Sequence, residues 1–98
     1  MNKKTKLNQQ ESELLNLLLE ESSEVIQAVS KTFRFGWDSC HPDKPNFSNK
    51  EHLEEEVGDL LCIIKLMVSK GIIDFDNVER CAHYKLDKLR KFSTVKVD

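Results

Sequence analysis

Three stretches of this 98-residue chain begin with a helix-capping signal and continue with apolar residues spaced three and four apart. The capping pairs are Asn8 with Glu11, Ser48 with Glu51, and Asp76 with Glu79. In each pair the first side chain can accept a hydrogen bond from the free N–H groups of the first turn, and the acid lies where the helix dipole favours it. Because such spacing is typical of amphipathic helices, the sequence predicts helices over about residues 8–33, 49–69 and 77–92.

The middle segment most restricts how these helices can pack. Apolar residues cover well over half of the circumference of 49–69, so this helix belongs in the middle of a bundle. A chain of this length can bury only a small core, and partner copies are expected to contribute to its stability. We therefore predict an all-α fold, with one domain over 1–98 whose three main helices assemble into an oligomeric four-helix-type bundle.

Composition also indicates where the chain is irregular. Residues 36–48 are rich in Gly, Pro, Asp and Asn, which predicts a loop that is long for a small domain. Gly71 is the expected end of the second helix. The segments 1–7 and 93–98 are expected to be loose tails.

Charge and cysteine content exclude several classes of protein. The formal net charge of −2 does not fit a dedicated nucleic-acid binder. No apolar run approaches the length of a membrane span and no hydrophobic signal core is present, so we expect neither a membrane partner nor export. Three cysteines without CxxC spacing are typical of reduced thiols, and we expect a cytoplasmic protein, in the host cytoplasm if a phage encodes it.

Acidic side chains occupy positions that the helix periodicity assigns to packing. Glu21 and Glu24 lie inside or beside the apolar stripe of the first helix, and Glu56 and Asp59 do the same on the second. Residues three apart are neighbours on a helix, so each pair points one way. Neither helix supplies an inward Lys or Arg at these levels, whereas Mg²⁺ prefers carboxylate oxygens. Two alternatives stay open: the acids are a solvated face, or they pair with basic residues across a subunit interface.

The residues carrying these acids resemble a known family. The segment "EESSE" (20–24) fits the pattern EExxE, and "EVGD" (56–59) fits ExxD about thirty residues later. That ordered pair, with "VSKTFRFGWDS" and "EEEVGDLLCIIKLMV" around the loop, resembles the short phage- and bacteria-type members of the MazG-like all-α nucleoside triphosphate pyrophosphohydrolases. The resemblance covers roughly 14–92.

The resemblance implies an activity and a set of site residues. It implies a homodimer or homotetramer that uses Mg²⁺, with Mn²⁺ as the alternative ion, to convert a (deoxy)nucleoside triphosphate to the monophosphate and pyrophosphate. The implied metal ligands are Glu21, Glu24, Glu56 and Asp59. Glu24 and Glu20 are the implied catalytic acids, which orient or deprotonate water. The expected substrate contacts are Lys85, Lys88, Arg90 and Lys91 for phosphates, with Trp37 in the loop and Arg34 just before it.

Two further functions remain in competition with this activity. One is phosphoribosyl-ATP pyrophosphohydrolase activity, which belongs to the same superfamily and is separated from the first only by its substrate. The other is a non-catalytic helical dimerisation module, in which Mg²⁺ would not raise the melting temperature.

Overall fold

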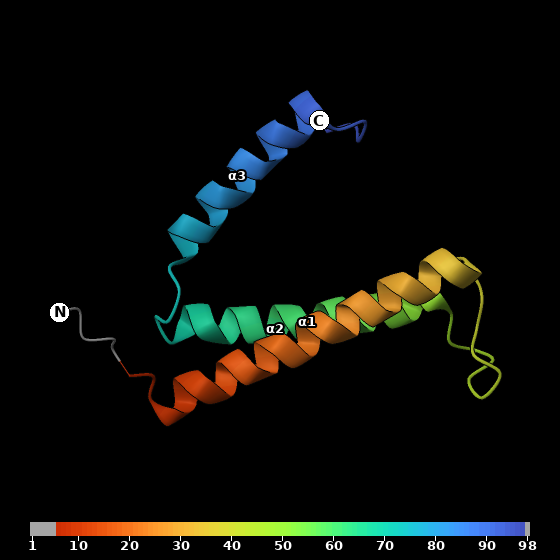
Figure 1. Cartoon of the computed structure of the whole chain (residues 1–98), viewed down its shortest axis with the longest axis horizontal. Coiled ribbons are helices and arrows are strands. Elements are labelled where there is room, and N and C mark those ends of the chain that lie inside the picture. Colours follow the sequence, from red (N-terminus) through yellow and green to blue (C-terminus); the bar gives the residue numbers. More distant parts are fainter. Residues whose placement is uncertain (1–5, 98) are drawn as a thin grey trace. The chain divides into compact units, whose positions relative to one another are not determined.

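The computed structural model describes residues 6–97, which form three helices: α1 (Gln9–Phe35), α2 (Asn49–Ser69) and α3 (Phe75–Phe92) (Figure 1). No strand forms within this range, where Cys40 and Ser48 make an isolated antiparallel bridge. The predicted all-α fold is confirmed. Residues 1–5 of the expected N-terminal tail, and Asp98 at the other end, lie outside the described residues.

Two of the three predicted capping boxes form. The Asn8 side chain accepts a hydrogen bond from the Glu11 N–H at 2.7 Å, and the Glu11 carboxylate accepts one from the Asn8 N–H at 2.9 Å. At α2 the Ser48 hydroxyl accepts from the Glu51 N–H at 3.1 Å, and the Glu51 carboxylate accepts from the Ser48 N–H at 3.2 Å. These local bonds explain why both helices begin where the sequence predicts.

The predicted start of the third helix is wrong by two residues. Asp74, not Asp76, is the N-cap, and its carboxylate accepts hydrogen bonds from the N–H groups of Asp76 at 2.8 Å and Asn77 at 3.4 Å. Asp74 is an equally good capping residue and lies earlier in the chain, so the helix begins at Phe75. Asp76 then occupies the first turn, where the helix dipole still favours its charge.

Glycines end the first two helices. α1 continues two residues beyond the predicted Phe33 and is closed by Gly36, whose φ of 87° suits a residue without a Cβ and whose N–H donates to the Thr32 carbonyl at 2.8 Å. Gly71, with a φ of 70°, follows α2 and donates its N–H to the Val68 carbonyl at 3.0 Å. The prediction that Gly71 ends the second helix is confirmed.

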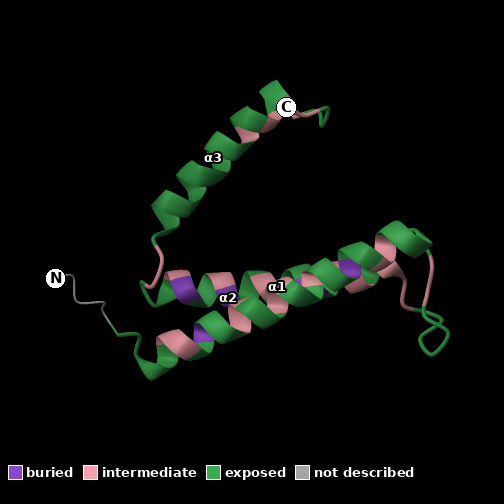
Figure 2. Cartoon of the chain, in the orientation of Figure 1, coloured by how far each residue is buried: buried purple, intermediate pink, exposed green. Residues whose placement is uncertain are grey.

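The chain divides into two compact units, one up to Leu66 and one from Met67 onward. In the first unit, α1 and α2 lie side by side as an antiparallel hairpin (Figure 1). Leu14 and Ala28 of α1 and Ile63 of α2 are buried (Figure 2), and Ala28 is only 1% exposed. The second unit contains the end of α2, the turn at Gly71 and α3. No residue of α3 is buried.

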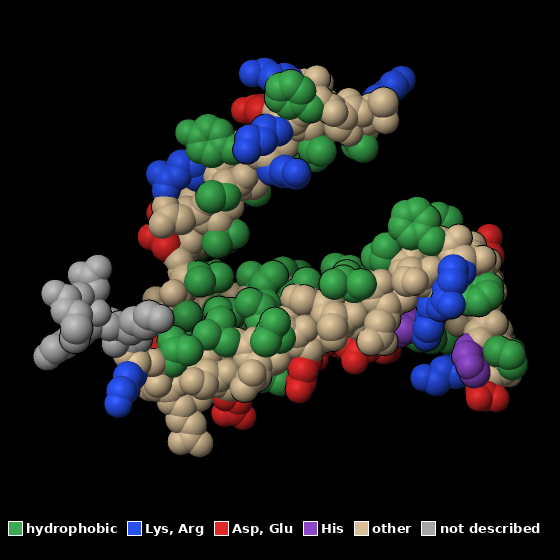
Figure 3. Space-filling model, in the orientation of Figure 1, with side chains coloured by type: hydrophobic (Ala, Val, Ile, Leu, Met, Phe, Trp, Pro, Cys, Tyr) green, Lys and Arg blue, Asp and Glu red, His purple; other side chains and the backbone are tan. Residues whose placement is uncertain are grey.

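Many large apolar side chains of the hairpin are exposed. Hydrophobic side chains gather along one side of α1 and α2, whereas Asp and Glu gather along the opposite edge (Figure 3). The exposed large apolar residues of the two helices include Leu19, Ile26, Val57 and Leu61. Within residues 6–97, no helix is long and apolar enough to cross a membrane. The expected oligomer stays a prediction.

Candidate metal centre

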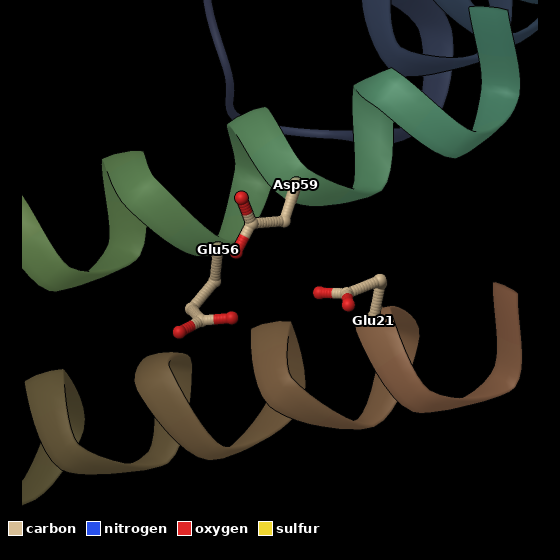
Figure 4. A group of neighbouring side chains, drawn as sticks. All are labelled: Glu21, Glu56 and Asp59. Atoms are coloured by element: carbon tan, nitrogen blue, oxygen red, sulfur yellow. The ribbon is translucent and has the colours of Figure 1, made fainter. Parts of the chain in front are cut away.

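Three carboxylates meet between the two helices of the hairpin. Glu21 extends from α1 toward α2, while Glu56 and Asp59, one turn apart on α2, extend toward α1 (Figure 4). One carboxylate oxygen from each residue lies within 4.8 Å of the other two. The antiparallel packing of α1 and α2 therefore joins one acid of the EExxE segment to both acids of the ExxD segment.

Burial differs across this cluster. Glu56 is buried, with 7% of its surface exposed; Glu21 is half-buried, and Asp59 is exposed. The cluster thus reaches from the helix interface to solvent. Such an arrangement combines one buried carboxylate, Glu56, with one that is open to solvent, Asp59.

No lysine or arginine among residues 6–97 compensates the negative charge of the cluster. Partial burial, followed by the negative charges of Asp59, Glu56, Glu24 and Glu20, raises the pKa of Glu21 above its ordinary value of 4.5. Among residues 6–97, no Lys or Arg forms an ion pair with any of the three clustered acids. Converging carboxylate oxygens without a Lys or Arg match the ligands that Mg²⁺ and Mn²⁺ prefer, so the residues fit a hard divalent ion.

The other two predicted acids lie at the edge of the cluster. Glu24 and Glu20 are both exposed, and neither contributes an oxygen to the group formed by Glu21, Glu56 and Asp59. Both are near enough for their charges to affect the pKa of Glu21. The structure therefore brings together three of the four predicted ligands, with Glu24 on the solvent side of α1.

Sequence reasoning missed one residue of this site. This residue is His52, whose side chain is only 23% exposed and whose Nε2 lies 3.2 Å from Oε1 of Glu56. The two residues are four apart on α2, which places them on one side of the helix. This HxxxE spacing is the signal in the sequence that could have identified the pair.

A cleft adjoins the acidic cluster inside the first unit. It has a volume of about 680 Å³ and is lined by Lys31 and Phe35 of α1, Lys44 and Phe47 of the loop, and His52 and Glu56 of α2. Glu56 belongs both to the cleft wall and to the carboxylate cluster. The cleft and the cluster of acids therefore share Glu56.

Backbone hydrogen bonds hold the loop over the start of α2 and so shape the cleft. The N–H groups of Asn49 and Lys50 donate to the carbonyls of Ser39, at 2.8 Å, and Trp37, at 3.0 Å. The Asn49 side chain donates to the Gly36 carbonyl at 2.9 Å. Within the loop, Lys44 lies with its Nζ 5.7 Å from the centre of the Phe47 ring. This long loop thus forms one wall of the cleft.

The predicted substrate contacts do not line the cleft. Arg34 is exposed and its guanidinium stacks on Phe35, 5.1 Å from the ring centre, so it lies behind a residue of the cleft wall. Trp37 is 54% exposed and is not part of that wall. The predicted phosphate contacts all lie on α3, in the second unit: Lys85, Lys88, Arg90 and Lys91. Arg90 pairs there with Asp87 at 2.9 Å.

The helical hairpin and its cluster define an all-α protein with an acidic centre between two helices. Comparison with known families makes the assignment specific. Residues 9–91 match the family model described as the MazG nucleotide pyrophosphohydrolase domain, and the chain therefore belongs to the MazG family. This membership points to nucleotide pyrophosphohydrolase activity in general. No curated protein and no solved structure gives a match.

Proposed function

We propose that this protein is a Mg²⁺-dependent pyrophosphohydrolase of (deoxy)nucleoside triphosphates, releasing the nucleoside monophosphate and pyrophosphate. The observation that carries the proposal is the convergence of Glu21, Glu56 and Asp59 within 4.8 Å in a chain of the MazG family. In this reaction the oxygen of water adds to the α-phosphorus, the bond to the β-phosphate breaks, and pyrophosphate leaves with the electrons of that bond.

The three clustered carboxylates are the proposed ligands of the ion. A divalent ion bound there would neutralise phosphate charge and lower the pKa of a water molecule. Glu24 and Glu20 are the proposed catalytic carboxylates, because they are exposed beside the cluster and as carboxylates can orient water or accept a proton from it. Their negative charge also helps to concentrate cations at the site.

The cleft is the proposed site of the nucleoside. Phe35 and Phe47 provide aromatic surface against which a base can pack, and Lys31 and Lys44 provide positive charge for the phosphates of an anionic substrate. Because Glu56 lies in both the cleft and the cluster, a nucleotide in the cleft directs its phosphates toward the acids. Arg34 and Trp37 are proposed as additional contacts at the exposed rim of the loop.

The basic residues of α3 are proposed to contact the phosphates of the substrate. We propose a homodimer or homotetramer because the hairpin exposes Leu19, Ile26, Val57 and Leu61, and extensive exposed apolar surface typically marks a protein interface. Light scattering of the purified protein tests this. Leu61→Glu should produce a monomer that retains its helical circular dichroism. An unchanged molecular mass would show that Leu61 does not lie in the interface.

The activity is tested by measuring pyrophosphate release from a panel of nucleoside triphosphates, deoxynucleoside triphosphates and phosphoribosyl-ATP, with Mg²⁺ and with EDTA. Glu21→Gln and Asp59→Asn each remove one clustered carboxylate and should lower kcat/KM at least about 100-fold, a loss typical of catalytic groups. Glu54→Gln is the matched control, because Glu54 is exposed on α2 and outside the cluster.

The possible results separate the competing functions. Hydrolysis confined to phosphoribosyl-ATP would assign the alternative substrate. A folded protein that cleaves no nucleotide with Mg²⁺, while Asp59→Asn alters only its assembly, would favour the non-catalytic dimerisation module. Equal loss in Glu54→Gln and Asp59→Asn would show that the cluster has no special role.

A further inference from the structure

We infer that His52 is a positioning residue for Glu56: it holds this carboxylate in the orientation in which the cluster binds its divalent ion. The inference rests on the proposed function, since it concerns the same ion. It starts from the contact between the imidazole Nε2 and the carboxylate Oε1, 3.2 Å apart, between two side chains of which 23% and 9% are exposed.

Glu56 needs such a partner more than the other acids do. It is the one buried member of the cluster, so water contributes least to orienting its carboxylate. Within residues 6–97, His52 is the one basic side chain within 4.0 Å of a carboxylate oxygen of the cluster. A carboxylate has two oxygens; when one contacts the imidazole, the other remains able to bind a cation. Partners of this kind, which orient a ligand without touching the ion, commonly determine how tightly a site binds metal.

The imidazole is itself held from a second side. The ring of Phe47 lies 5.8 Å from the His52 ring, centre to centre, tilted by 53°. Phe47 comes from the loop, which backbone hydrogen bonds attach to the start of α2. His52 therefore lies between an aromatic residue of the cleft wall and a carboxylate of the cluster, and it fixes the second by packing on the first.

Metal affinity tests this inference without relying on turnover. Mn²⁺ binding is measured by electron paramagnetic resonance at constant pH, without nucleotide, for the wild-type protein, His52→Ala and His52→Gln. Loss of the contact should weaken Mn²⁺ affinity about 10- to 100-fold in His52→Ala, the usual effect of removing such a partner. Gln places an N–H group at similar reach and should recover most of the affinity.

A matched control comes from the loop. His41→Ala removes an imidazole that contacts Asp43 rather than the cluster and should leave Mn²⁺ affinity unchanged. Circular dichroism reports whether each variant retains its helices. If His52→Ala loses its helical signal, His52→Asn replaces it, because Asn is polar but one bond too short to reach Glu56, and the same loss of affinity is expected.

Several results would overturn the inference. Wild-type affinity in His52→Ala would show that Glu56 needs no partner, and tighter binding would show that His52 competes with the ion. An affinity in His52→Gln as low as in His52→Ala would assign the effect to the imidazole's bulk. Each of these leaves the proposed function intact, whereas a wild-type protein that binds no Mn²⁺ would overturn both.

Discussion

Mg²⁺ should stabilise the folded protein, and the carboxylate cluster provides the physical reason. Folding brings Glu21, Glu56 and Asp59 within 4.8 Å without a Lys or Arg among them, and the separated charges of the unfolded chain cannot bind an ion in the same way. An ion that binds only the folded state stabilises it by RT ln(1 + [Mg²⁺]/Kd). Asp59→Asn is the informative perturbation, because Asp59 is exposed and its replacement leaves the buried core unchanged.

The expected magnitude follows from the length of the chain and from the number of ligands. At a Mg²⁺ concentration ten times the Kd, the stabilisation is about 1.4 kcal/mol. The unfolding entropy of 98 residues is roughly 0.2 kcal/mol per degree, so Tm should rise by about 7 °C. Removing one of three carboxylates should weaken the affinity at least about tenfold, which leaves about 0.4 kcal/mol and a rise of about 2 °C at the same concentration.

Thermal unfolding followed by circular dichroism measures both shifts. Each protein is melted in EDTA and in Mg²⁺, with KCl matching the ionic strength so that charge screening is the same. Glu54→Gln removes an acid of α2 outside the cluster and should keep the full rise in Tm. The reasoning is refuted if Mg²⁺ raises Tm equally in the wild-type protein and in Asp59→Asn, or in neither.

Three further predictions follow from individual residues. In EDTA, the raised pKa of Glu21 contributes stability that is complete below its ordinary pKa of 4.5 and is lost as pH rises through the raised value; Tm should therefore fall more across this range in the wild-type protein than in Glu21→Gln. Gly71→Ala forces a φ of 70° on Ala and should lower the free energy of unfolding by about 1 kcal/mol. Gly58→Ala lies inside α2 with open space around the added Cβ and should raise the free energy of unfolding by up to about 1 kcal/mol. Urea titration measures both changes, and changes of equal sign would contradict the backbone argument. Phe47→Ala should raise KM for the nucleotide because it removes aromatic surface from the cleft, and steady-state kinetics with an unchanged KM would exclude the cleft as the nucleoside site.

Local interactions made the helices predictable from sequence. Two of the three helices begin at caps identified from residues three apart, and two of them end before glycines that adopt positive φ. The third start was misplaced because Asp74 and Asp76 are both good capping residues, and sequence spacing alone did not choose between them. Which acids share a side of one helix was also predictable, because i and i+3 positions are neighbours whatever the helix packs against.

The composition of the site depended on contacts between residues far apart in the chain. Only the packing of α1 against α2 selects Glu21, rather than its neighbour Glu24, to meet Glu56 and Asp59, because a small rotation or shift of one helix changes which side chain faces the other. The structure identifies His52 as a partner of Glu56 because Glu56 is buried beside it. It identifies Phe47 as a partner of His52 because hydrogen bonds attach the loop to the start of α2. The sequence by itself thus determined the helices and the acids available on each, since these depend on neighbours within one or two turns. Tertiary structure alone decided which of those acids share a site, since that depends on the register between two helices joined by a loop.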